Sequence, residues 1–312
     1  MSNFPTVELP EVNAAPALVQ LISELRAQYN DAINAVVIYG SCLRSGDIFD
    51  GLLDIYLICD SYRSAYDGSR LALGNWLLPP NVFYIESEYE GKILRSKYAV
   101  ISSADFAKFC SPARFESYIW GRFAQPVAVP WHRDQPSLDN LHQSLQQAVT
   151  TFLGRSLPSI PASGTVTSLW QDSLALSYNT ELRSEGNNRA GQLAQMSASH
   201  FARATELVAA QVRPPLNLHR VDGELHYQSS VTRWQTRWST LGWAWRGISG
   251  KLLSVLRLLK ALFTFRGGLD YIAWKLERHS GEEIVIPDRV RRYPLVFLWG
   301  FFWQLYRRGI FK

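Results

Sequence analysis

The chain has 312 residues, of which 47% are apolar and 19% charged, so two or three modest domains with a sizeable core are expected. Its formal net charge of +5 favours an anionic partner: a nucleotide, a nucleic acid or an acidic lipid surface. Three scattered cysteines without CxxC spacing argue against a disulfide framework or a zinc site, and no apolar run reaches the roughly 18 residues of a membrane span.

The first third of the chain has the pattern of an α/β domain. A helix is predicted around 15–29, where apolar side chains recur at helical spacing. A Ser/Gly-rich linker is predicted over 60–80, and a further helix over 106–123, before Pro126. Strands are predicted near 35–39, 52–58, 81–86 and 93–101.

The rest of the chain is predicted to be mainly helical, over 137–154, 166–212, 247–264 and 294–308, with breaks at 156–164, 213–215 and 267–268. The helix over 247–264 is amphipathic. Its polar face carries Lys251, Arg257 and Lys260, and its apolar face carries Leu252, Val255, Leu256, Leu259, Leu262 and Phe263. The usual arrangement of such a helix is an apolar face in the core and a solvated charged face.

The most informative motif joins the first two predicted strands. The first strand runs into Gly40-Ser41, and the second carries Asp54 near its start. A Gly-Ser turn lets backbone amides approach a nucleoside triphosphate, and a strand carboxylate can hold the magnesium ion that bridges its phosphates. This pattern is typical of polymerase-β-type nucleotidyltransferases, except that Tyr56 replaces their usual second carboxylate.

A second metal ligand must therefore come from elsewhere in the chain. Glu86 is the first candidate because it lies on or near a strand of the same predicted sheet. Asp60 and Glu88 are also candidates, although solvated surface charges explain them more simply. Cations are needed beside the phosphates, and Lys97 and Arg122 are expected to supply them. The alternative for Lys97 is a lysine at a strand edge, and the alternative for Arg122 is a salt bridge at a helix end.

Several segments, in order, resemble the mitochondrial phosphatidate cytidylyltransferases of the translocator assembly and maintenance family, which also has bacterial members. Tyr56 fits this resemblance, because the family lacks the second Asp as well. Ala99 departs from the family's Gly, and Glu181 from its Asp. The matching segments are Tyr39-Gly40-Ser41, Asp54-Ile-Tyr-Leu57, Gly91–Ile101, Tyr118–Val127, Ser177–Glu185 and Gly250–Gly281.

The resemblance implies that CTP and phosphatidate react to give CDP-diacylglycerol and pyrophosphate, with Mg²⁺ as cofactor. The expected catalytic residues are Asp54, Lys97 and Arg122, and the expected metal ligands are Asp54 and Glu86. The expected nucleotide-binding residues are Tyr39, Gly40, Ser41 and Lys97. Lys251, Arg257 and Arg266 could bind the lipid phosphate, and a second patch could comprise Tyr178, Glu181, Arg183 and Glu185. Plain solvated helix faces are the alternative for both sets.

The end of the chain, Tyr293–Lys312, is aromatic and finishes with basic residues. Trp and Tyr prefer the membrane–water boundary, and Arg and Lys favour anionic lipid. We therefore expect a cytoplasmic protein that binds an anionic membrane surface peripherally, on its inner face. A core helix or a dimer interface is the alternative for this segment.

Together these patterns predict an α/β (α+β) protein. A nucleotidyltransferase domain with a mixed sheet and flanking helices is expected over 1–135, a mainly helical, winged-helix-like domain over 136–290, and a membrane-associating amphipathic helix over 291–312. Two other functions stay open. The same site could serve a small soluble or protein acceptor, or the basic helix over 247–264 could belong to a non-catalytic nucleic-acid-binding module. Nucleic acid is the least expected partner because cations are few and aromatics many.

Overall fold

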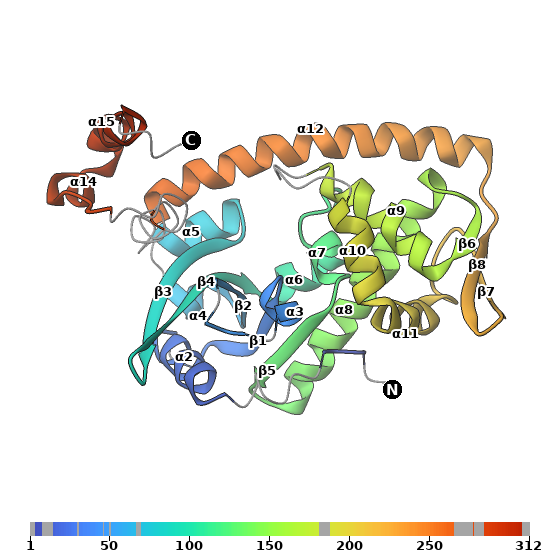
Figure 1. Ribbon diagram of the computed structural model, residues 1–312, viewed down its shortest axis with the longest axis horizontal. Coiled ribbons are helices and arrows are strands. Elements are labelled where there is room, and N and C mark those ends of the chain that lie inside the picture. Colours follow the sequence, from blue (N-terminus) through green and yellow to red (C-terminus); the bar gives the residue numbers. More distant parts are fainter. Residues whose placement is uncertain are drawn as a thin grey trace.

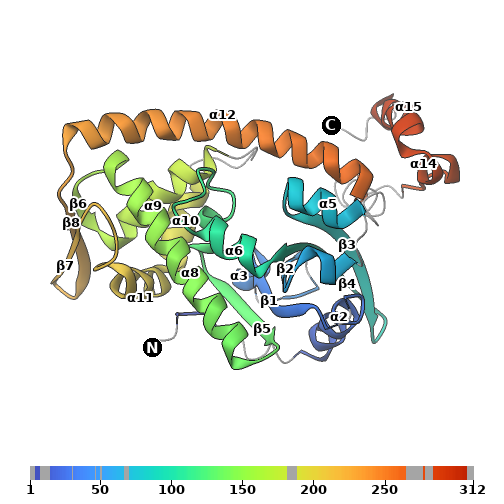
Figure 2. The same cartoon turned by 180° about the vertical axis from the view of Figure 1, so that it is seen from behind.

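The computed structural model describes residues 4–7, 15–29, 31–45, 47–49, 51–66, 70–180, 188–264, 277 and 284–307. A five-stranded mixed sheet with flanking helices adjoins a mainly helical part that contains a small three-stranded sheet. A long helix runs along both of them (Figure 1, Figure 2). The predicted α/β class, with a mainly helical second half, is confirmed. The proposed domain boundaries stay predictions.

The elements of the first half are α2 (Pro16–Ala27), β1 (Ile33–Tyr39), α3 (Cys42–Ser45), β2 (Leu53–Cys59), α4 (Tyr62–Tyr66), α5 (Arg70–Leu77), β3 (Asn81–Tyr89), β4 (Lys92–Ser102), α6 (Ser103–Cys110), α7 (Trp120–Phe123) and β5 (Val127–His132). Those of the second half are α8 (Gln135–Ser156), the 3₁₀ turn η1 (Leu157–Ser159), β6 (Ser163–Thr165), α9 (Val166–Tyr178), α10 (Asn188–Met196), α11 (Ala198–Val208), β7 (Leu216–Val221), β8 (Glu224–Ser229), α12 (Arg233–Thr264), α14 (Asp288–Arg292) and α15 (Pro294–Arg307).

The five-stranded sheet has the order β3-β4-β2-β1-β5, in which β2 and β4 are parallel and the other neighbours antiparallel. Side chains alternate between its faces. In β2, Ile55 and Leu57 enter a core with α2, whereas Tyr56 and Ile58 enter a second core on the opposite face. Because both faces are buried, β1 and β2 are nearly continuous apolar runs.

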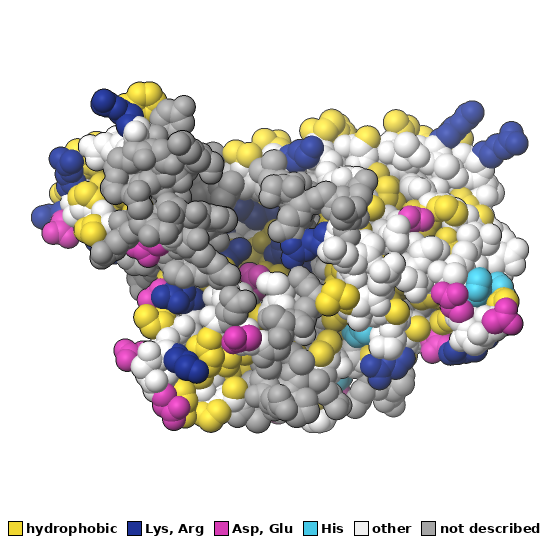
Figure 3. Space-filling view, in the orientation of Figure 1, with side chains coloured by type: hydrophobic (Ala, Val, Ile, Leu, Met, Phe, Trp, Pro, Cys, Tyr) yellow, Lys and Arg dark blue, Asp and Glu magenta, His cyan; other side chains and the backbone are white. Residues whose placement is uncertain are grey.

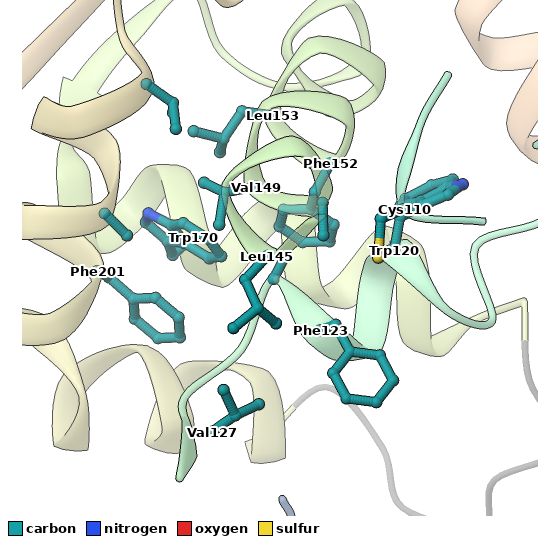
Figure 4. Packing of buried hydrophobic residues seen from close by; sticks show 14 of the residues in the cluster. Cys110, Trp120, Phe123, Val127, Leu145, Val149, Phe152, Leu153, Trp170 and Phe201 are labelled. Atoms are coloured by element: carbon teal, nitrogen blue, oxygen red, sulfur yellow. The ribbon is translucent and has the colours of Figure 1, made fainter. Parts of the chain in front are cut away.

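The second core continues into the helical part. Phe152 of α8 stacks on Trp170 of α9 with ring centroids 5.2 Å apart, and Trp170 stacks on Phe201 of α11 at 4.1 Å (Figure 4). Tyr56 belongs to the same hydrophobic cluster. The helical part therefore packs on the sheet face that carries Tyr56 and, two residues earlier, Asp54.

The elements from α8 to β8 follow a winged-helix-like order of helix, strand, helices and hairpin. The small sheet has the order β6-β8-β7, so its first strand pairs with its last. This arrangement was expected in the second half of the chain. The helix over 247–264 belongs to α12, however, which follows the hairpin and lies outside this arrangement.

Several local predictions in the first half were wrong. The segment 60–80 is not a linker, because it holds α4 and α5. The side chain of Asn75 anchors α5 by donating to the carbonyl of Val100 and accepting from the backbone N–H of Asn81. The predicted helix over 106–123 is interrupted between α6 and α7, where Pro112 cannot donate a helical hydrogen bond. Strand β5 was not predicted, and the winged-helix-like expectation for the second half gave no residue range for the β7–β8 hairpin.

The amphipathic helix over 247–264 has the opposite orientation to the expected one, with apolar side chains toward solvent. Leu252, Val255 and Leu256 are exposed, as is Lys251, whereas Lys260 faces the body of the protein. The Lys260 ammonium donates to the carbonyls of Leu78 and Pro80 and to the side chain of Asn81, at 2.8 and 2.9 Å for the last two. These oxygens replace water, and burial together with the charge of Arg257 lowers the pKa of Lys260 to about 8.

Near the end of the chain, α15 confirms the predicted final helix. The expected break at Gly267-Gly268 lies outside the described residues. No helix within the described ranges combines the length and the apolar composition that crossing a bilayer requires.

Gly250 lets α12 approach the backbone at the end of α9 closely, because a Cβ there would lie 2.5 Å from the carbonyl oxygen of Thr180. Gly247, one turn earlier, has open space around its Cα. We expect Gly250→Ala to lower the free energy of unfolding by about 1–3 kcal/mol. We expect Gly247→Ala to leave it unchanged or raise it by up to about 1 kcal/mol through helix propensity. Urea unfolding measures both, and equal effects would contradict the close packing of α12.

Candidate active site

The Gly-Ser turn lies directly against the carboxylate of β2. Tyr39 and Asp54 are register partners at the ends of β1 and β2, and Gly40 follows with φ +95°. A Cβ at Gly40 would lie 3.0 Å from Asp54 Oδ2. Both the backbone conformation and the space therefore favour glycine here. The two parts of the motif, separated in the sequence, meet at one edge of the sheet.

Lys97 lies beside Asp54 on the neighbouring strand. The register places Tyr39, Asp54, Lys97 and Tyr84 in one row across β1, β2, β4 and β3. Residues that are opposite one another in a sheet point to the same face, with strands about 4.8 Å apart. The predicted pairing of a phosphate-binding turn, a carboxylate and a lysine is thus present in one place.

The structure does not bring Glu86 to Asp54. Glu86 lies on β3, two strands from β2, which corresponds to about 10 Å across the sheet. Its Oε1 accepts from the Tyr84 hydroxyl at 2.7 Å and from Arg95 Nε at 3.1 Å. Asp60 is held by Arg133 at 2.8 Å. Of the proposed metal ligands, Asp54 alone faces the Gly-Ser turn.

Tyr56, at the place of the missing carboxylate, is a core residue. Its ring meets Phe123 edge-on at 4.8 Å and Tyr39 at 5.5 Å, and no part of the side chain is exposed. Burial, together with the negative charge that ionised Tyr118 would carry, keeps the pKa of Tyr56 well above its ordinary value. An ionised carboxylate would be strongly disfavoured in this aromatic surrounding.

A cluster of cations surrounds Tyr118, just before α7. The guanidinium carbons of Arg122 and Arg257 lie 4.4 and 4.0 Å from the centroid of its ring, and Arg122 Nη1 donates to the Tyr39 hydroxyl at 3.4 Å. Burial opposes ionisation of the phenol, but Arg122, Arg257 and Lys97 together lower the pKa of Tyr118 to about 8. Positive charge is therefore concentrated around the Tyr118 ring.

Among the residues that the structure describes, two of these cations lack an acidic partner. Within the described part of the chain, no carboxylate forms an ion pair with Lys97 or Arg257. Arg257 Nε is buried and has no hydrogen-bond acceptor among the described residues. An unsatisfied buried donor costs free energy, so this arrangement favours an incoming anion. Figure 3 shows Lys and Arg side chains gathered in the hollow beneath α12.

A cavity of about 610 Å³ opens between the sheet edge and the helical part. Gly40, Ser41 and Asp54 line one side, and His200 and Arg203 of α11 line the other. Burial and the charge of Arg203 lower the pKa of His200 to about 4, so the imidazole is neutral near neutral pH. Neither ring nitrogen of His200 has a hydrogen-bond partner in the described part of the chain. The volume is that of a typical small-molecule site and suits a nucleotide.

Sequence reasoning found part of this site. Arg257 and Tyr178 do reach it: Tyr178 lines the cavity and its hydroxyl donates to Gln125 Oε1 at 3.0 Å. Lys251 does not, because it is exposed on the other side of α12. Glu181, Arg183, Glu185 and Arg266 lie outside the described residues. Tyr118, His200 and Arg203 were missed, and only Tyr118 lay in a recognised segment.

The side chains at this site suit magnesium only together with the phosphate oxygens of a substrate. Across the described residues, no three His, Cys, Asp or Glu side chains gather where they could hold a metal. Mg²⁺ needs less protein than that, because one or two carboxylates, phosphate oxygens and waters complete its octahedron. Asp54 faces the Gly-Ser turn, where Gly40 has no side chain to fill the space between them. Its carboxylate therefore suits a magnesium ion that arrives together with a triphosphate.

The chain was compared with protein families, curated proteins and solved structures. No family model and no curated protein matches the chain. Among solved structures, the chain is similar to a nucleotidyltransferase-like protein from Exiguobacterium sibiricum, at 9% sequence identity and a TM-score of 0.26. The similarity covers 69% of this chain and 99% of that one.

The lowered pKa of Tyr118 can be measured directly. We expect the ultraviolet absorbance of tyrosinate to show a transition near pH 8 that is absent in Tyr118→Phe. Tyr293→Phe, at an exposed position, should leave the transition in place. Inorganic pyrophosphate should move it to higher pH, because a bound anion offsets the cations that stabilise the phenolate. A transition that survives in Tyr118→Phe would show that the cations do not act on Tyr118.

Proposed function

We propose that the protein is a phosphatidate cytidylyltransferase, which transfers a cytidylyl group from CTP to phosphatidate and releases pyrophosphate. The observation that carries the proposal is the position of the Tyr118 cation cluster beside the Gly40–Asp54 contact. One half of this site is suited to a nucleotide and its metal, and the other to a second phosphate. The choice of CTP and phosphatidate rests on the family resemblance of the sequence.

In this proposal the nucleotide lies over the Gly-Ser turn, whose backbone contacts the triphosphate. Asp54 holds magnesium, which supplies positive charge to the phosphate oxygens when it is bound. Arg203 and neutral His200 face the nucleotide from the helical part. His200 can donate one hydrogen bond without adding charge.

The acceptor needs positioning more than activation. A phosphate monoester loses its second proton with a pKa of about 6, so it is already a nucleophile at neutral pH. Its approach to a triphosphate is opposed by the repulsion of two anions. Lys97, Arg122 and Arg257 reduce that repulsion, and Tyr118 positions the two guanidiniums through its ring.

A nucleic-acid-binding role has less support. The β7–β8 hairpin of the winged-helix-like part carries charges of both signs, and Arg220 is paired with Glu206 at 2.8 Å. Binding to a nucleic-acid backbone depends on a continuous basic face. The cations Arg122 and Arg257 instead contact the ring of Tyr118 at the candidate active site.

Radiolabelled CTP incubated with phosphatidate, magnesium and detergent tests the activity. We expect CDP-diacylglycerol, and we expect Asp54→Asn to lower its rate by roughly 1000-fold, because a metal ligand is lost. Thermal unfolding of Asp54→Asn should match the wild type. Labelling of glycerol 3-phosphate but not of phosphatidate would show a soluble acceptor, and a preference for ATP would overturn the choice of nucleotide.

Two cations of α12 form a matched pair of variants. Arg257 contacts Tyr118 inside the site, whereas Lys251 is exposed on the outward side of the same helix. We expect Arg257→Gln to lower the rate by roughly 100-fold, because a charged donor to the acceptor phosphate is lost. We expect Lys251→Gln to change the rate little in detergent. Equal rates for both variants would contradict the placement of the acceptor phosphate.

A further inference from the structure

α12 presents a continuous apolar stripe to solvent. Each side chain of the stripe is between 44% and 65% exposed, and the steps between them alternate between four and three residues. The members are Trp234, Trp238, Leu241, Trp245, Ile248, Leu252 and Val255. Figure 3 shows hydrophobic side chains along the upper edge of the molecule, over α12. A contiguous exposed patch of this kind marks an interaction surface.

The opposite face of the same helix fixes this orientation. Trp243 is 7% exposed and Arg246 3%, and Gly250 packs against the backbone of Thr180. Residues two apart on a helix point about 200° away from each other. Trp245 and Ile248 must therefore face outward while Trp243 and Arg246 are buried. The apolar stripe is thus a stable feature of the docked helix.

The charge of α12 indicates which kind of surface could cover the stripe. Arg233, Arg237 and Lys251 are exposed beside it, and the segment 233–264 contains no Asp or Glu. Two copies of the helix would bring like charges together, whereas paired helices with this spacing usually rely on acid–base pairs at their flanks. An anionic lipid surface complements the same residues.

The aromatic content points to the same surface. Trp side chains prefer the membrane–water boundary, where the ring is buried and its N–H stays near water. A groove of about 680 Å³ adjoins the first half of the stripe, lined in part by Trp234, Trp238 and Trp245. Arg155 and Arg213 also line it. The stripe therefore continues into a groove that combines apolar walls with cations.

We propose that α12 docks the protein on an anionic lipid bilayer, with the helix lying in the plane of the interface and its stripe among the headgroups and upper acyl chains. This surface is distinct from α15, whose exposed Trp299 and Trp303 lie on another helix. The proposal is independent of the transferred nucleotide. It also orients the molecule, because Arg257 and Lys260 on the inward side of α12 face the candidate site and the body of the protein.

A fluorophore placed in the stripe tests this directly in the full chain. Cys42, Cys59 and Cys110 are buried, so an introduced surface cysteine can be labelled selectively. We expect a polarity-sensitive dye on Ile248→Cys to shift to the blue with vesicles of equal parts phosphatidylcholine and phosphatidylserine. The same dye on Val19→Cys, which is 53% exposed on α2, should not shift. Absence of a shift at position 248 overturns the proposal. This holds even if the protein still binds the vesicles through α15.

Vesicle partitioning provides the second measurement. We expect Trp245→Ser with Leu252→Ser to lower the partition coefficient by about 10-fold or more, through loss of buried apolar area. The control pair, Val19→Ser with Val221→Ser, removes exposed apolar side chains elsewhere and should partition like the wild type. Equal partitioning of the two pairs overturns the proposal. So does a wild-type dimer, seen by sedimentation, that the stripe variant converts to a monomer, because a second copy would then be the occupant.

Discussion

The docking of α12 on the rest of the molecule is the interaction on which the candidate site depends. Its inward face contacts both halves of the protein: Lys260 donates to carbonyls beside β3, and Trp243 Nε1 donates to the carbonyl of Arg155 at 3.0 Å. Arg246 Nε donates to the carbonyl of Phe115 at 2.8 Å. These contacts hold α12 along its length, and Arg257 reaches Tyr118 as a result. The site is therefore assembled from segments more than two hundred residues apart.

The site balances charge differently from one built on two carboxylates. A second carboxylate beside Asp54 would lower the charge of the metal and repel an incoming phosphate. Here an aromatic side chain takes that place, and cations gather around Tyr118 instead. With fewer negative groups, the site repels an incoming anion less. The cost is a concentration of positive charge in the free protein, which anions or partial ionisation of Tyr118 can relieve.

The sequence predicted what depends on local pattern. Apolar runs buried on both faces marked the strands of the sheet, and the Gly-Ser turn with Asp54 marked the sheet edge that lines the cavity. The orientation of α12 could not be read in this way, because an apolar face normally predicts the buried side. That expectation fails where backbone carbonyls accept hydrogen bonds from the ammonium of an inward-facing lysine such as Lys260. His200 and Arg203 were missed for a related reason, because only tertiary packing brings α11 opposite the Gly-Ser turn.

The shared core has a consequence for how substrates enter. Phe152, Trp170 and Tyr56 belong to one hydrophobic cluster, so the sheet and the helical part are joined by close packing rather than by a flexible linker. Close-packed interiors resist shear, and a hinge that swings one half against the other would break many of these contacts. The cavity between them is thus of nearly fixed width. Selection among ligands of the cavity then depends on their fit to a preformed wall, and ligand exchange depends on smaller movements at the rim of the cavity.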